Sequence, residues 1–164
     1  MKEAKYRTLF MDMAKRSAEM SYCERAKVGA VIVKDDRVIV NSWNGTITGA
    51  DNCCEEACEV CRGSGKVSSY EERKCERCGG KGLTSKKTVV HAEANAILFA
   101  AKNGIKTEGC SVYVTLSPCV ECSKMMIQAG IKEVIYDTEY RDMSGADFLK
   151  ENGINVHKYN KKGQ

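Results

Sequence analysis

Apolar residues recur at helical spacing near the N-terminus and then fall into two short β-branched runs. Between Tyr6 and Met20 they repeat every three or four residues, which predicts an amphipathic helix that covers a sheet. From Val28 to Trp43, two runs rich in Val and Ile flank the polar stretch Lys34–Asp36. Such runs around a polar turn are typical of a β-hairpin. The chain therefore begins with a helix and a two-stranded hairpin.

The second half of the chain alternates helical and strand patterns. A segment rich in strong helix formers begins at His91 and is stopped by Gly104. Ser117 and Pro118 are predicted to serve as the N-cap and the first-turn proline of a later helix, which Gly130 ends. The elements after Gly104 are predicted as strand, helix, strand, helix and strand over Ser111–Leu116, Cys119–Ala129, Glu133–Tyr136, Gly145–Glu151 and Ile154–Tyr159.

These elements predict an α/β fold with one mixed sheet of five strands. A helix between two strands favours a parallel pair through a right-handed crossover, so the last two strands are expected to be parallel. Helices on both faces give a three-layer α/β/α arrangement. Between Asp51 and Lys87 the composition shifts to Cys, Gly, Glu, Lys and Ser, which cannot build an apolar core. We expect a single domain over residues 1–164 with a small insert at about 51–87.

Composition limits the functional classes. Hydrophobic residues make up 43% and charged residues 29%, which is ordinary for a globular protein. No run of about 18 apolar residues and no secretory leader is present, so we expect a cytoplasmic protein without membrane contact. The ten cysteines then fit metal ligands in a reducing compartment better than a disulfide scaffold. The net charge of +4 comes from interspersed Lys and Glu, which argues against a nucleic-acid partner.

Two short motifs carry the chemistry. His91-Ala92-Glu93 and Pro118-Cys119-Val120-Glu121-Cys122 each open a predicted helix, and together they are typical of zinc-dependent deaminases of nucleobases. One imidazole and two thiolates from His91, Cys119 and Cys122 leave the fourth position of a tetrahedral zinc ion open, as in catalytic sites. Glu93 is close enough to move protons without being a ligand. The predicted reaction is hydrolytic deamination of a cytosine-type base.

Each motif alone has an ordinary explanation. A His-x-Glu pair on a helix is commonly an exposed salt bridge, and a Cys-x-x-Cys pair is commonly structural or redox-active. Their occurrence together, each at a helix start, favours the deaminase. A deaminase acting on tRNA or single-stranded DNA should show a basic, aromatic track, but the chain has three Phe and one Trp. A zinc-knuckle binding module, with the insert as its functional part, remains the alternative outside enzymes.

The insert contains a repeated motif, Cys-x-x-Cys-x-Gly-x-Gly. The two copies begin at Cys58 and Cys75, and their thiols, at Cys58, Cys61, Cys75 and Cys78, predict a closed four-cysteine zinc site. The repeats also resemble the cysteine-rich zinc modules of J-domain chaperones, although two repeats are half of that array. We expect one catalytic zinc ion and at least one structural zinc ion.

Across most of its length the chain resembles the deoxycytidylate (dCMP) deaminases, in particular their phage and bacterial members. The resemblance rests on Lys27–Val31, Trp43–Gly45, His91–Ile97, Tyr113–Cys119 and Gly130–Tyr136, and Asn95 separates this family from tRNA-adenosine, guanine and riboflavin-pathway deaminases. It implies deamination of dCMP to dUMP, which supplies thymidylate synthesis. It also implies substrate contacts at Arg25, Asn44, Ala92, Ser117, Tyr140 and Arg141, with the two arginines on the phosphate.

The same resemblance implies assembly and regulation. Family members are commonly homo-hexamers that dCTP activates and dTTP inhibits, and phage relatives carry Arg where Lys102 stands near the subunit and effector region. Related phage enzymes hold a structural zinc with cysteines at the places of Cys23, Cys53 and Cys54, helped by histidines. This chain has only His91 and His157. Either the knuckle thiols replace that site, or Cys23 and the Cys53-Cys54 pair complete another one. If phage-encoded, the protein would work in the host cytoplasm.

Overall fold

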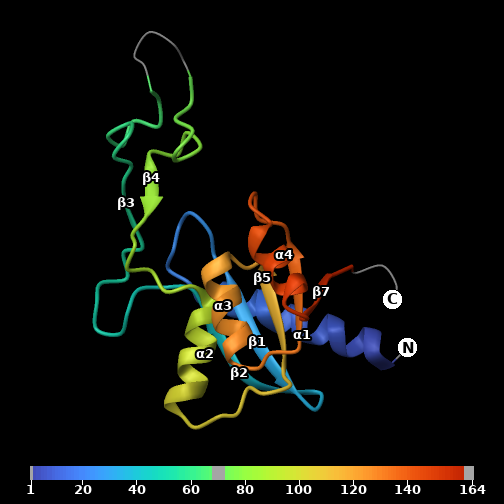
Figure 1. Cartoon of the computed structure of the whole chain (residues 1–164). Coiled ribbons are helices and arrows are strands. Elements are labelled where there is room, and N and C mark those ends of the chain that lie inside the picture. The colour runs from blue at the N-terminus through green and yellow to red at the C-terminus, as the bar shows by residue number, and fades with distance from the viewer. Residues whose placement is uncertain (1, 68–72, 161–164) are drawn as a thin grey trace. The chain divides into compact units, whose positions relative to one another are not determined.

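The computed structural model describes residues 2–67 and 73–160 of the chain. It divides into two compact units (Figure 1). The first, here the sheet unit, comprises Met1–Ser21, Lys27–Asn44 and Val90–Gln164. The second, here the knuckle unit, comprises Tyr22–Ala26 and Gly45–Val89 and contains the predicted insert. No described helix is long and apolar enough to cross a membrane.

The sheet unit contains the five-stranded mixed sheet that the sequence predicts. Its strand order is β2-β1-β5-β6-β7. Strand β1 pairs antiparallel with β2 and with β5, whereas β5 and β6, and then β6 and β7, pair in parallel. The elements are α1 (Lys2–Ala18), β1 (Gly29–Lys34), β2 (Arg37–Trp43), α2 (Ala92–Lys102), β5 (Ser111–Leu116), α3 (Val120–Gln128), β6 (Glu133–Thr138), α4 (Ser144–Glu151) and β7 (Asn155–Lys158).

Helices cover both faces of this sheet, so the three-layer prediction is confirmed. Successive residues of a strand point to opposite faces, and each central strand therefore serves two cores. In β1, Val31 packs in the core beneath α1 and Ile32 in the core beneath α2 and α3. In β5, Tyr113 packs in the core beneath α1 and Val112 in the core beneath α2 and α3. Figure 1 shows α2 and α3 on the face opposite α1, with α4 beside α3.

The hairpin prediction is also confirmed. Asp35 and Asp36 connect β1 to β2 with φ angles of 49° and 58°. Two consecutive residues in this left-handed region are typical of the tight turn whose twist matches a two-stranded hairpin, and aspartate tolerates that region well. The register shifts by one residue between Val33 and Ile32, and beyond that irregularity Ser42 lies opposite Ala30.

The knuckle unit contains a two-stranded antiparallel sheet of β3 (Glu55–Ala57) and β4 (Leu83–Ser85). The sequence did not predict these strands, because each has three residues and neither alternates apolar with polar side chains over a useful length. The buried cluster in this unit consists of the four knuckle cysteines. Within the described residues, thiols take the place of the apolar core that the composition of the insert cannot supply.

Candidate active site

Two helix N-termini bring the predicted catalytic residues together. His91 is the N-cap of α2, and Cys119 is the N-cap of α3, which begins one residue later. Neither side chain caps its own helix, although N-cap side chains commonly do so. The imidazole and the thiol are therefore free to face each other. Cys122 follows in the first turn of α3, at the position that returns to the same side of the helix.

The three predicted ligands form one group. The Nδ1 atom of His91 lies 3.5 Å from the Sγ atom of Cys119 and 3.4 Å from that of Cys122. All three ligand atoms lie within 4.8 Å of one another. Glu93, at the second position of α2, is 4% exposed. The structure thus places the buried carboxyl group of Glu93 in the first turn of α2, two residues after the ligand His91.

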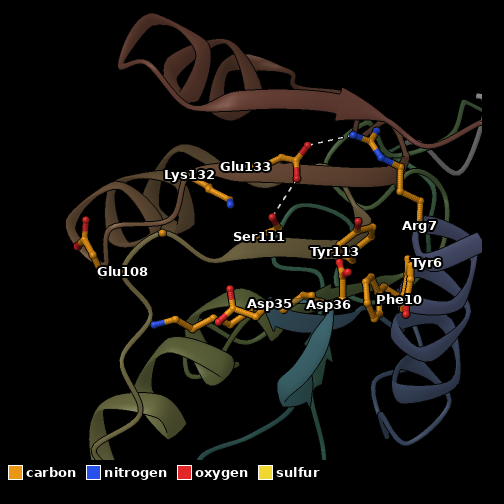
Figure 2. Close-up of a pocket in the computed structure, with 13 residues that line it drawn as sticks. Tyr6, Arg7, Phe10, Asp35, Asp36, Glu108, Ser111, Tyr113, Lys132 and Glu133 are labelled. Atoms are coloured by element: carbon orange, nitrogen blue, oxygen red, sulfur yellow. Dashed lines mark hydrogen bonds and ion pairs between the residues drawn. The ribbon is translucent and has the colours of Figure 1, made fainter. Parts of the chain in front are cut away.

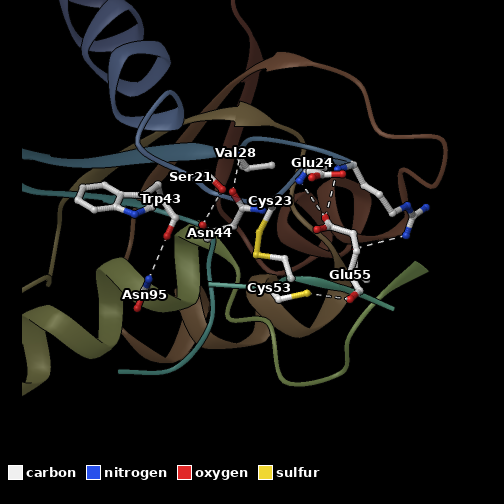
Figure 3. The surroundings of a disulfide bond; sticks show 12 residues. Ser21, Cys23, Glu24, Val28, Trp43, Asn44, Cys53, Glu55 and Asn95 are labelled. Carbon is white, nitrogen blue, oxygen red and sulfur yellow. Dashed lines mark hydrogen bonds between the residues drawn. A yellow bond between two sulfur atoms is a disulfide. The ribbon is translucent and has the colours of Figure 1, made fainter. Parts of the chain in front are cut away.

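Hydrogen bonds to the hairpin hold the start of α2 in place. The Ser42 hydroxyl donates to the carbonyl of Ala92 at 2.7 Å, which ties β2 to the first turn of α2. The side-chain amide of Asn95 donates to the backbone carbonyl of Trp43 at 2.9 Å (Figure 3). The sequence marked Asn95 only through resemblance, and it gave no role to Ser42. A buried serine in a strand carries no sequence signal that distinguishes it from an ordinary sheet residue.

A second pair of hydrogen bonds fixes the start of α3. The Ser123 Oγ atom lies 2.9 Å from the carbonyl oxygen of Cys119 and 2.9 Å from that of Gly145, so its single proton is shared between these two acceptors. Ser123 is fully buried, so the first turns of α3 and α4 are joined inside the protein. Sequence reasoning missed this residue because its spacing fits no catalytic motif.

The two thiols differ sharply in acidity. Hydrogen bonds from the Cys122 thiol and from His91 lower the pKa of Cys119 to about 3. The pKa of Cys122 is raised, first by its hydrogen bond to the Cys119 thiolate and then by burial. The pKa of His91 is also raised, chiefly because its ring donates to Cys119. Without a cation the pair therefore carries one negative charge, and a divalent cation would allow both thiols to ionise.

Burial raises the pKa of Glu93 above its ordinary value. The backbone hydrogen bond and the nearby imidazole act in the opposite direction but are outweighed. A carboxyl group whose pKa lies closer to neutral can both accept and return a proton near pH 7. Glu93 has the protonation behaviour expected of a general acid and base.

The predicted N-cap role of Ser117 is wrong. Helix α3 begins at Val120 with Cys119 as its N-cap, and Pro118 precedes the cap. The Ser117 hydroxyl instead accepts a hydrogen bond from the backbone N–H of Tyr140 at 2.7 Å and donates to the Sδ atom of Met143 at 3.3 Å. Because Ser117 lies two residues before the cap, its side chain is directed to the loop between β6 and α4.

The other predicted substrate residues of the sheet unit lie on loops, after a strand and at the start of α2. The guanidinium of Arg141 lies 5.8 Å from the centre of the Tyr140 ring, and the side chains of both residues are exposed. The side-chain oxygen of Asn44 accepts from the backbone N–H of Val28 at 2.8 Å, so Asn44 also closes the strand pair β1 and β2. Ala92 is fully buried at the first position of α2.

Arg25, the other predicted phosphate ligand, belongs to the knuckle unit. The carboxylate of Glu55 accepts from the backbone N–H groups of Glu24 and Arg25 at 3.0 and 3.1 Å. The guanidinium of Arg25 donates to the Ser85 hydroxyl at 3.3 Å, and its Nε atom is buried with no hydrogen-bond partner among the described residues. Sequence reasoning did not anticipate this anchoring by Glu55 and Ser85.

Seven of the eight remaining cysteines fall into two sets. Cys58, Cys61, Cys75 and Cys78 form one buried group that could hold a metal ion. Cys23 and Cys54, predicted as candidate further ligands, are joined by a disulfide, and a disulfide sulfur has no thiolate to give a metal (Figure 3). Cys53 is exposed, and its thiol donates to the carbonyl of Glu55 at 3.4 Å. In this oxidised form the three cysteines do not supply a ligand set.

Cys110 and His157 lie outside these sets. Cys110 is fully buried in the core beneath α2 and α3, as expected of a small hydrophobic residue. His157 in β7 is about half exposed, with its Nε2 atom 3.7 Å from a carboxylate oxygen of Glu133. Neither residue belongs to a group of metal ligands within the described part of the chain.

A cavity of about 640 Å³ lies away from the candidate active site. It lies at the N-terminal ends of the parallel strands, where Ser111 begins β5 and Glu133 begins β6. Figure 2 shows Glu133 there accepting hydrogen bonds from Arg7 at 3.2 Å and from Ser111 at 2.9 Å. The His91 group lies instead beyond the C-terminal end of β5, where ligands of open α/β sheets bind.

The chain is similar to known proteins over most of its length. Residues 4–138 match the family model described as the cytidine and deoxycytidylate deaminase zinc-binding region. The chain is 38% identical to the deoxycytidylate deaminase of Enterobacteria phage T4 over an alignment of 165 positions. The alignment covers 88% of this chain and 85% of that one. It is 36% identical to ComE operon protein 2 of Bacillus subtilis, over 95% of this chain and 72% of that one.

A solved structure gives the corresponding three-dimensional match. The dCMP deaminase of cyanophage S-TIM5, in complex with dCMP and dUMP, superposes with a TM-score of 0.76 at 34% sequence identity. The match covers 94% of this chain and 97% of the cyanophage chain. The similarity therefore extends over the sequence motifs and over the fold that positions them.

Proposed function

The chain belongs to the deoxycytidylate deaminase family, and from that premise we propose that it hydrolyses the 4-amino group of dCMP, giving dUMP and ammonia. The observation that carries this proposal is the buried carboxyl group of Glu93, two residues after His91, which forms one group with Cys119 and Cys122. The cyanophage relative that binds dCMP and dUMP supports the choice of nucleotide.

The donor set fits a zinc ion. Tetrahedral zinc with its usual bonds to nitrogen and sulfur separates the two donor atoms by about 3.5 Å. The distances from the Nδ1 atom of His91 to the two sulfurs are 3.5 and 3.4 Å, so both nitrogen–sulfur separations suit a zinc ion. Three protein ligands leave one coordination position for a small molecule, and a zinc ion held there polarises water and lowers its pKa towards about 7.

Glu93 moves the protons in the proposed reaction. It takes one proton from the attacking water and delivers it to N3 of the pyrimidine, while the oxygen adds to C4. It then carries the second proton from that oxygen to the amino nitrogen, the C4–N bond breaks, and ammonia leaves. The carbonyl of the uracil product forms as the nitrogen departs. The raised pKa of Glu93 suits both transfers, because the group must hold and then release a proton near neutral pH.

Substrate recognition is proposed to involve the residues that the family resemblance names. Arg25 and Arg141 would bind the 5′-phosphate, because a guanidinium presents paired donors that fit phosphate oxygens. Tyr140 would pack on the sugar or base, and Ser117 would hold the Tyr140 loop through its 2.7 Å hydrogen bond. Asn44 is proposed to contact sugar and base. Ala92 offers a backbone N–H in the first turn of α2, where amides have no partner within the helix.

The biological setting is part of the same proposal. The product dUMP would feed thymidylate synthesis in the cytoplasm, with dCTP as activator, dTTP as inhibitor and a homo-hexamer as the assembled form. Lys102 is the last residue of α2 and is exposed, which leaves it available to a neighbouring subunit or an effector. These features follow from the family resemblance rather than from the site geometry.

A comparison of three substrates tests the proposed function. Ammonia release is measured for the zinc-loaded protein with dCMP, with deoxycytidine and with a single-stranded cytosine oligonucleotide. The proposal expects dCMP to be the best substrate by at least about tenfold in kcat/KM, because the phosphate contacts contribute binding energy that deoxycytidine cannot use. Preference for the oligonucleotide would instead indicate a deaminase of nucleic acid and would overturn the assignment.

A further inference from the structure

The knuckle unit contains four buried thiols that are not joined by disulfides. The Sγ atoms of Cys58 and Cys75 lie 3.9 Å apart, and those of Cys61 and Cys78 lie 3.7 Å apart. A disulfide would bring such atoms to about 2.05 Å. Four thiolates around a tetrahedral zinc ion, each at about 2.3 Å from the metal, lie about 3.8 Å from one another. The observed separations therefore match the edges of a tetrathiolate zinc site.

Backbone amides face two of these sulfurs. The N–H of Gly65 donates to the Sγ atom of Cys61 at 3.2 Å, and the N–H of Gly82 donates to that of Cys78 at 3.3 Å. Such donors stabilise negative charge on sulfur and orient the ligand. The two contacts are equivalent in the two repeats, because each glycine lies four residues after its cysteine.

The two knuckles are related by an approximate twofold symmetry. The N–H of Cys58 donates to the carbonyl of Gly82 at 2.8 Å, and the N–H of Cys75 donates to that of Gly65 at the same distance. The first cysteine of each repeat is therefore bonded to the last glycine of the other repeat. This exchange cannot be deduced from one repeat, since it requires both.

The packing around Gly65 and Gly82 explains why the last position of each repeat is a glycine. A Cβ atom added to Gly65 would lie 2.3 Å from the carbonyl oxygen of Gly80, and one added to Gly82 would lie 2.2 Å from that of Gly63. Both contacts are with backbone, which cannot move aside as a flexible side chain could. The last glycine of each knuckle thus allows the backbones of the two knuckles to interlock around the thiols.

We propose that Cys58, Cys61, Cys75 and Cys78 hold one structural Zn²⁺ ion, and that the crossed packing of Gly65 and Gly82 creates this site. Four thiolate ligands leave no open coordination position, so the site is structural and separate from the group at His91. Its buried cluster consists of the four cysteines themselves. Metal binding is therefore coupled to the folding of the knuckle unit, as in small zinc modules generally.

Metal analysis of the full chain gives the first test. The protein is purified with zinc, and bound zinc is counted per chain beside the number of rapidly reacting thiols. The proposal expects two zinc ions per chain when the His91 group is also loaded, with the four knuckle thiols protected. Replacement by cobalt should give the absorption of a four-sulfur site in addition to that of a site with one nitrogen and two sulfur ligands. One metal ion per chain, with the knuckle thiols reactive or oxidised, would overturn it.

Matched glycine variants test the interlock. Gly82→Ala places a methyl group against the Gly63 carbonyl, whereas Gly79→Ala meets no atom within 4 Å. Both positions have positive φ, at 75° and 61°, so the strain of adding a side chain is common to the two variants. We expect Gly82→Ala to lose the knuckle zinc and Gly79→Ala to retain it. Retention by both variants would contradict the role of crossed packing.

Two further measurements keep the result independent of variant folding and of the deaminase proposal. Cys58→Ser should reduce zinc from two ions to one per chain while the cobalt spectrum of the His91 group remains. The wild-type cobalt spectrum decides whether a four-sulfur site exists even if a variant fails to fold. No readout uses ammonia release, so failure of this inference leaves the proposed reaction untouched, and the reverse also holds.

Discussion

The hydroxyl oxygen of Ser117 accepts a 2.7 Å hydrogen bond from the backbone N–H of Tyr140. Ser117 follows β5 at the edge of the candidate active site, and Tyr140 precedes Arg141 in the loop between β6 and α4. The bond connects the segment that leads into the thiol ligands with the segment proposed to bind the nucleotide. In the proposed function, one buried serine would therefore link substrate binding to the placement of the thiol ligands.

Ser117→Ala should weaken substrate binding without removing zinc. The Tyr140 N–H loses its acceptor, and the loop that carries Arg141 becomes less well held. We expect KM for dCMP to rise several-fold with little change in kcat and unchanged zinc content. Ser111→Ala, at the other end of β5, is the matched control, because that hydroxyl bonds only to Glu133 in the described structure. Equal KM values for the two variants would remove the proposed role of Ser117.

Arg141→Ala should discriminate between nucleotide and nucleoside. If the exposed guanidinium beside Tyr140 binds the 5′-phosphate, its loss should lower kcat/KM for dCMP by roughly tenfold or more and leave deoxycytidine nearly unchanged. Arg141→Lys should recover only part of the activity, since an ammonium lacks the paired donors. An equal loss with both substrates would mean that Arg141 does not contact the phosphate.

Asn44→Ala should destabilise the sheet unit. Its side-chain oxygen accepts from the Val28 N–H at 2.8 Å in a buried position, and removing it leaves that donor unpaired. The expected loss in the free energy of unfolding is about 1–3 kcal/mol. Asn41→Ala, in the adjoining strand β2 but exposed, is the control and should change stability by less than about 0.5 kcal/mol. Urea denaturation of both variants decides the matter, and similar stability losses would show that the bond contributes little.

Much of the fold was predictable because the pattern of apolar residues along the sequence indicates which positions are buried. Val31 and Ile32 serve opposite cores, and this burial of both faces is visible in the sequence as a continuous β-branched run. The catalytic ligands were predictable for a related reason. A metal site needs particular donor atoms, and His91, Cys119 and Cys122 provide them at a spacing that helix geometry brings together.

The parts that were missed depend on contacts between distant segments. Ser117 looked like an N-cap because Ser-Pro commonly begins a helix, but its partner Tyr140 lies 23 residues away. The pairing of Cys23 with Cys54 and the anchoring of Arg25 by Glu55 likewise join segments about thirty residues apart. Local pattern contains no information about such partners. The knuckle motif predicted four thiols, but the exchange of backbone bonds between its two copies required the structure.

The central claim is that Glu93 transfers the protons in hydrolysis of dCMP, and ammonia release by Glu93→Gln tests it most directly. Glu121→Gln is the matched control, because Glu121 lies between the two thiol ligands in sequence but is exposed and paired with Lys124 at 2.8 Å. We predict that Glu93→Gln keeps its zinc and loses kcat by at least about a hundredfold, whereas Glu121→Gln stays close to wild type. Near-wild-type turnover of dCMP by zinc-loaded Glu93→Gln would contradict the account.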